Sequence, residues 1–178
     1  MTLAAVVYQS GFPIDSFMAS VAARLRADGV RLAGLLQQNA EHAPTPCAAM
    51  DLVDLSDGTR VRISQDLGPY AEGCRLDPHA LAGIEDPLSR TISARPDIFI
   101  LNKFGKAEAE GDGLRAIFAR AIDAGIPMLT AVRPPHTEAW TAFHGGLAAD
   151  LAPELDAVLA WCRLQLPKKR PGTRAVAF

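Results

Sequence analysis

The chain has 178 residues, enough for one domain with a sizeable core, and its 49% hydrophobic and 21% charged residues are ordinary for a soluble globular protein. Its formal net charge of −2 gives no general electrostatic reason to bind nucleic acid. No hydrophobic run approaches the roughly 20 residues of a membrane span, and the first residues have no basic flank for a signal peptide, so we expect a cytoplasmic protein.

The first 36 residues predict a strand, a helix and a second strand. Residues 3–8 form a short apolar run, and the turn at residues 9–16 precedes a helical face made of Phe17, Met18, Val21 and Leu25. Gly29 is placed to end this helix, and residues 30–36 form the next apolar run. A right-handed crossover with parallel strands is expected. The first turn would offer helix N-terminal amides to an anion.

Two apolar runs at residues 50–55 and 60–64 flank Ser56–Thr59 and predict an inserted β-hairpin. Val61 and Ile63 alternate with two arginines, which indicates one buried and one exposed face. A helix should follow from Asp77, a suitable cap, with Pro78 at its first position. Pro87 is expected to kink this helix or break it in two.

Residues 98–101 are four apolar residues, too few for a helix, and predict a strand buried on both faces. A polar, glycine-rich stretch begins at Asn102 and runs to Gly113. Ligands of open α/β sheets bind beyond the carboxyl ends of the strands, so we expect a crevice there.

The rest of the chain predicts an amphipathic helix at 114–125, a strand at 127–132, a short helix with Trp140 and Phe143 in the core, and a final helix facing inward through Leu155, Val158, Leu159 and Cys162. We expect one α/β domain over residues 1–166, with a mainly parallel sheet, helices on both faces and the inserted hairpin. Residues 167–178 form a basic tail, expected to be disordered. The three cysteines show no metal-binding spacing and are expected to be free thiols.

The first turn fails the P-loop pattern GxxxxGK[ST]. If Gly11 takes the place of the internal glycine, Ile14 stands at the lysine position and Asp15 at the hydroxyl position. Pro13 removes an amide. A phosphate-binding turn and a plain turn capped by Asp15 or Ser16 both remain open.

The order of the elements nevertheless resembles the small nucleoside triphosphatases of the P-loop class. Their equivalent strand ends Asp-Glu-Ile-Gly-Lys-Met-Glu, and this chain has Asn-Lys-Phe-Gly-Lys-Ala-Glu at residues 102–108. Asn102 replaces the aspartate that helps to place magnesium, and Lys103 replaces the glutamate that activates water in that class. The resemblance implies the fold, without the usual catalytic set.

A closer resemblance is to a bacterial family of unknown activity that is often encoded near molybdate uptake genes. This chain contains two segments typical of that family. They are Gly-Cys-Arg-Leu-Asp-Pro at residues 73–78 and Asn-Lys-Phe-Gly-Lys-x-Glu-x-x-Gly at residues 102–111. The match is judged to run from residue 3 to about residue 146. It implies a cytoplasmic role, and a possible protein partner, in molybdenum metabolism.

The two departures from the P-loop pattern suggest an exchange of charge. In a P-loop fold the first turn neighbours the end of the central strand, so we predict that Asp15 and Lys103 lie within salt-bridge reach. The pair could simply close an abandoned phosphate site. Alternatively, lysine and arginine side chains could bind an oxyanion beside the first-turn amides. The residues proposed for this small anionic ligand are Gly11, Asp15, Ser16, Arg75, Asn102, Lys103, Lys106 and Glu108.

Three functions follow. The leading hypothesis is a degenerate P-loop-like protein that binds a nucleotide phosphate or a molybdate-like oxyanion without efficient hydrolysis. The first alternative is an unconventional magnesium-dependent nucleoside triphosphatase, in which Asp15 or Glu108 holds the metal ion. The second is a ligand-free protein-interaction module.

Overall fold

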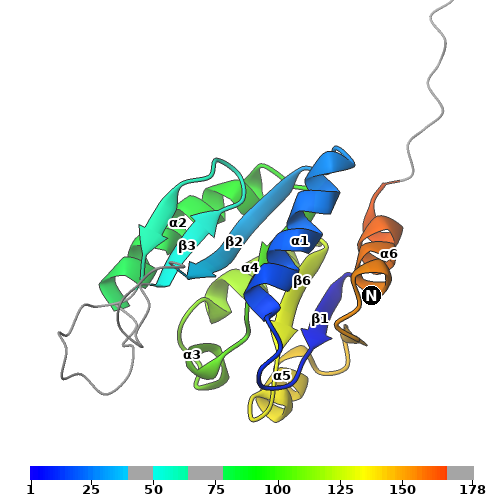
Figure 1. Ribbon diagram of the computed structural model, residues 1–178. Helices are drawn as coiled ribbons and strands as arrows, with labels where there is room; N and C mark the ends of the chain where they lie inside the picture. Colours follow the sequence, from blue (N-terminus) through cyan, green and yellow to red (C-terminus); the bar gives the residue numbers. More distant parts are fainter. Residues whose placement is uncertain (40–49, 64–77, 168–178) are drawn as a thin grey trace, which may run out of the picture.

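The computed structural model describes residues 1–39, 50–63 and 78–167. Seven strands form one sheet in the order β4-β3-β2-β5-β6-β1-β7 (Figure 1). The five neighbouring strands from β2 to β7 in this order pair in parallel, and only the β2–β3 and β3–β4 pairings are antiparallel. The strands are β1 (Leu3–Val7), β2 (Leu32–Asn39), β3 (Met50–Asp54), β4 (Arg60–Arg62), β5 (Ile98–Leu101), β6 (Met128–Val132) and β7 (Ala148–Leu151).

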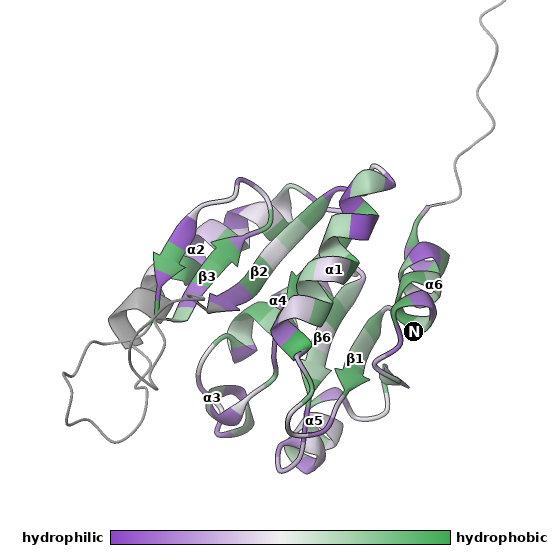
Figure 2. Cartoon of the chain, viewed as in Figure 1, coloured by the Kyte–Doolittle hydropathy of each residue, from purple (hydrophilic) through white to green (hydrophobic). Residues whose placement is uncertain are grey.

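Helices cover both faces of the sheet and give two hydrophobic cores. One core includes buried residues of α2, α4 and α5, and the other includes those of α1 and α6. In Figure 2 the strands β1 and β6 are largely hydrophobic, whereas α1 and α6 mix hydrophobic with polar residues, as expected for helices with one exposed face. The helices are α1 (Ile14–Ala27), α2 (Pro78–Ser93), α3 (Lys106–Ala109), α4 (Arg115–Asp123), α5 (Thr137–His144) and α6 (Leu155–Gln165).

This architecture confirms the predicted three-layer α/β fold. Every residue of β5 is buried, as expected for a strand covered on both faces. The hairpin β3–β4 exists and extends the sheet beyond β2. Strands β1 and β2 are parallel as predicted, but β6 and β5 lie between them. The carboxyl ends of β1, β5 and β6 therefore meet at one edge of the sheet.

Some features differ from the predictions, and some predicted features lie outside the described residues. Helix α2 is not broken, since it continues through Pro87, and its buried residues Ile84, Leu88 and Ile92 keep both halves on the sheet. The sequence patterns missed β7, a short edge strand beside β1, and the four-residue α3. Cys47, Cys74 and the basic tail lie outside the described residues. No helix of the described part is long and apolar enough to cross a membrane.

Gly34→Ala tests the tightest approach between strands. Gly34 in β2 has φ +110°, and a Cβ atom there would overlap the backbone of Ile100 in β5. We expect a loss of about 3 kcal/mol in the free energy of unfolding, from backbone strain and overpacking together. Gly58→Ala is the matched control, because Gly58 also has a positive φ of +80° but open space around it. It should lose about 1 kcal/mol in the same urea titration. Equal losses would contradict the steric argument.

Candidate functional site

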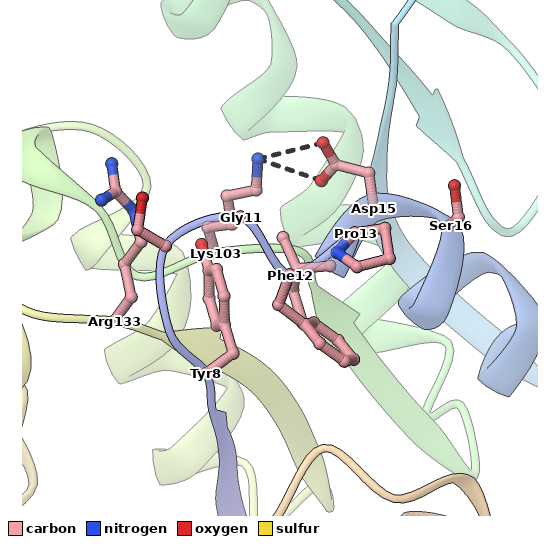
Figure 3. A pocket seen from close by; sticks show the side chains of 10 residues that line it. Tyr8, Gly11, Phe12, Pro13, Asp15, Ser16, Lys103 and Arg133 are labelled. Atoms are coloured by element: carbon pink, nitrogen blue, oxygen red, sulfur yellow. Dashed lines mark hydrogen bonds and ion pairs between the residues drawn. The ribbon is translucent and has the colours of Figure 1, made fainter.

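The turn between β1 and α1 borders a pocket of about 430 Å³. Side chains from two other strand ends, Lys103 after β5 and Arg133 after β6, complete its wall (Figure 3). The lining residues are Tyr8, Ser10, Gly11, Phe12, Pro13, Ile14, Asp15, Ser16, Lys103 and Arg133. The pocket thus lies at the carboxyl edge of the parallel strands, where ligand sites of such sheets occur.

Asp15 and Lys103 form an ion pair in this pocket, which confirms the sequence prediction. The Lys103 Nζ atom lies 3.0 Å from Oδ1 and 3.1 Å from Oδ2 of Asp15. It also donates to Gln37 Oε1 of β2 at 3.3 Å. The buried Asn102 donates its side-chain amide to the same carboxylate. The Asp15 carboxylate is therefore held by two consecutive residues that follow β5.

Helix α1 begins without a side-chain cap. Its first residue is Ile14, and the N-cap residue Pro13 forms no side-chain hydrogen bond to the first turn. The interpretation of Asp15 or Ser16 as a cap is therefore wrong, because Asp15 turns towards Lys103 instead. Ile14 is only 5% exposed and packs in the core, so it cannot replace the phosphate-binding lysine of a P-loop.

Arg133 and Tyr8 also line the pocket, and sequence reasoning missed both. They belong to neighbouring strand ends, because the Tyr8 amide donates to the carbonyl of Val132 at 3.1 Å. Burial raises the pKa of the Tyr8 phenol, and the Arg133 guanidinium opposes this shift through its charge and by hydrogen bonding. The phenol therefore stays protonated near neutral pH beside an exposed guanidinium. The only sequence signal was a basic residue directly after a buried strand.

The structure does not bring Lys106 and Glu108 into this pocket. Lys106 is exposed and pairs at 3.7 Å with Glu110, the residue that directly follows α3. Glu108 is buried, and its two carboxylate oxygens accept hydrogen bonds from the amides of Gly105 and Leu114, each at 3.0 Å. Glu108 therefore fixes the loop after β5 rather than facing a ligand. Arg75 lies outside the described residues.

Glu108→Ala should destabilise the protein by about 2 kcal/mol, because it leaves two amides of a buried loop without their acceptor. Glu108→Gln keeps one acceptor oxygen and should lose less. Glu110→Ala is the control, since its side chain is 61% exposed and its ion pair is a surface contact. Thermal and urea unfolding of the three variants would contradict this role if Glu108→Ala and Glu110→Ala behaved alike.

The pocket combines two cationic side chains with one carboxylate. It also faces the N-terminal end of α1, where the helix dipole favours negative charge. Within residues 1–39, 50–63 and 78–167, no cluster of three or more histidine, cysteine or carboxylate side chains could hold a metal ion. The lining residues therefore carry two positive charges, from Lys103 and Arg133, against the one negative charge of Asp15.

The sheet and its covering helices define a single three-layer α/β domain with a mainly parallel sheet, and the pocket lies at its first turn. The solved structure of a human cancer-related nucleoside triphosphatase has the same fold, with a TM-score of 0.61 over 84% of this chain and 88% of that one, at 16% sequence identity. The chain itself belongs to the family described as "Protein of unknown function (DUF2478)", which matches residues 3–161. The match extends beyond residue 146 and includes part of α6, so the boundary expected from the motifs was too early.

A curated relative is the protein named "Molybdenum import ATP-binding protein ModC 2" of Bradyrhizobium diazoefficiens. The two sequences are 37% identical over 161 residues, which is 90% of this chain. The chain spans only 18% of the length of that relative. The name of this relative therefore describes a much longer protein, of which the matching segment is one part.

Proposed function

We propose that the first-turn pocket binds a tetrahedral oxyanion, either the phosphate of a nucleotide or a molybdate-like ion, without efficient hydrolysis. The observation that supports this most directly is the position of Lys103 and Arg133 in one pocket with a single carboxylate, Asp15. Opposite unit charges about 4 Å apart attract by about 4 kcal/mol at an effective dielectric constant of 20. The net positive charge and the uncapped start of α1 both favour an anion.

Slow hydrolysis is proposed because the pocket offers little to activate water. Asp15 is the only carboxylate among its lining residues, and it is already bound to Lys103 and Asn102. The two positions that hold acidic residues in the resembled triphosphatases are Asn102 and Lys103 here. A general base must be able to accept a proton from the attacking water, and this arrangement makes Asp15 a poor one.

A role in molybdenum handling is part of the proposal. It is supported by the name of the 37% identical relative, which refers to molybdenum import and ATP binding. Molybdate and phosphate are both tetrahedral oxyanions, so one cationic pocket suits either. The protein partner in such a role could be a molybdenum transport component.

Calorimetry and thermal shift with ATP, GTP, phosphate, molybdate, tungstate and sulfate test this proposal, each with and without magnesium. A ligand that binds only the folded state at a hundredfold excess over its Kd stabilises the protein by about 2.7 kcal/mol. We expect such a shift with at least one of the first five anions and a smaller one with sulfate. Magnesium-dependent nucleotide hydrolysis would favour the triphosphatase alternative. No shift at millimolar concentrations would favour the interaction module and overturn the proposal.

A further inference from the structure

The two cations of the pocket differ in what they already contact, and this difference allows their roles to be separated. Lys103 has three close acceptor contacts, to both oxygens of Asp15 and to Gln37. An ammonium group has three hydrogens to donate. Lys103 is therefore occupied, and its charge is balanced by the carboxylate that it holds. In Figure 3 the dashed lines join only this pair.

Arg133 has a different environment. In the described part of the chain no carboxylate forms an ion pair with it, although it is exposed and lines the same pocket. Arg133 directly follows the buried strand β6, so its backbone lies at the carboxyl edge of the parallel strands. Tyr8, only 6% exposed, follows the adjacent β1 and presents its phenol beside the guanidinium. Within the described residues, Arg133 is thus an exposed cation of the pocket wall that contacts the Tyr8 phenol and has no carboxylate in an ion pair.

We infer that Arg133, positioned by Tyr8, is the residue that receives the oxyanion, while Lys103 serves to neutralise Asp15. This inference rests on the proposed function and gives Arg133 and Lys103 different roles in the same pocket. A guanidinium presents a planar fork of N–H donors that matches two oxygens of a tetrahedral anion, which a single ammonium cannot do. The ligand class is therefore an anion with two accessible terminal oxygens, such as molybdate or a phosphate monoester.

Calorimetric titration of the full chain with molybdate, phosphate and ATP tests the assignment. Arg133→Met should weaken binding of the anion that the wild type binds by at least about tenfold, because a charge-assisted hydrogen-bonding partner is lost. Arg133→Lys keeps the charge but loses the fork, so it should recover only part of the affinity. Arg24→Met is the matched control: Arg24 is an exposed arginine near the other end of α1, and its removal should leave the affinity unchanged.

Tyr8→Phe tests whether Tyr8 positions Arg133 or only stabilises the fold. In the wild-type background this substitution should weaken anion binding by about threefold, because the Arg133 guanidinium is less ordered. In the Arg133→Met background it should have no further effect on anion binding. A merely structural role of Tyr8 would give the same loss in both backgrounds. Equal melting temperatures of the variants would show that the fold is kept.

The outcomes separate the two proposals. A wild type that binds an anion together with an Arg133→Met variant that binds it equally well would overturn the assignment of Arg133 and leave the proposed function standing. A wild type that binds none of the three anions would overturn both.

Discussion

The double variant Asp15→Asn Lys103→Met is expected to bind the oxyanion about as tightly as the wild type, although the two single variants should differ by about a hundredfold. Lys103→Met leaves the Asp15 carboxylate without its cation, so the negative charge of Asp15 repels the anion and the affinity falls. Asp15→Asn leaves the positive charge of Lys103 unbalanced, so Lys103 attracts the anion and the affinity rises. At exposures of 30% and 22% these side chains are partly solvated, so we expect about 1.4 kcal/mol, or tenfold, in each direction.

Calorimetry at low ionic strength is the suitable measurement, because salt screens these interactions. Ser20→Ala is the control, since Ser20 is an exposed, uncharged residue of α1 that does not line the pocket. Comparison of the two single variants with the double variant also distinguishes the proposed oxyanion binding from the triphosphatase alternative. If Asp15→Asn abolished binding of magnesium-ATP rather than strengthening it, Asp15 would be a metal-ion ligand, and the triphosphatase alternative would replace the oxyanion receptor.

The sequence predicted the Asp15–Lys103 contact because two pieces of information agreed. The fold class placed the first turn next to the end of the central strand, and the departures at these positions had opposite charges. The strand Ile98–Leu101 was equally clear, since four apolar residues bounded by polar ones fit a buried strand of a parallel sheet. Such local patterns reflect burial, which dominates the energetics of the core.

Arg133 could not be assigned in this way. A single basic residue after a strand is common, and only the order of strands shows that β6 lies beside β1. Glu108 was misjudged for a related reason, since a carboxylate that bonds two amides of its own loop looks the same in the sequence as one that faces a ligand. Strand β7 was missed because its residues are half-buried or exposed at the sheet edge and so lack a clear apolar run. These features depend on contacts between distant segments.

Trp140→Ala is expected to lower the free energy of unfolding by about 4 kcal/mol, the largest stability effect that we expect in this protein. Trp140 is 1% exposed, and its ring centroid lies 5.2 Å from that of Phe104 and 6.3 Å from that of Phe118. This burial confirms the sequence prediction that Trp140 lies in the core. Urea unfolding measures the loss, and a value below about 1 kcal/mol would contradict the packing argument.

Trp140→Phe is the matched control and connects this cluster to the pocket. In the described part of the chain the Trp140 Nε1 atom has no hydrogen-bond partner, so phenylalanine should keep most of the packing and lose only about 1 kcal/mol. Phe104, which Trp140 supports, directly follows Lys103 and donates its amide to the carbonyl of Ala131 at 2.9 Å. A cavity beneath Phe104 should therefore loosen Lys103 as well, so Trp140→Ala should weaken anion binding under conditions where it is still folded. Trp140→Phe should bind as the wild type does, because Phe104 keeps its support.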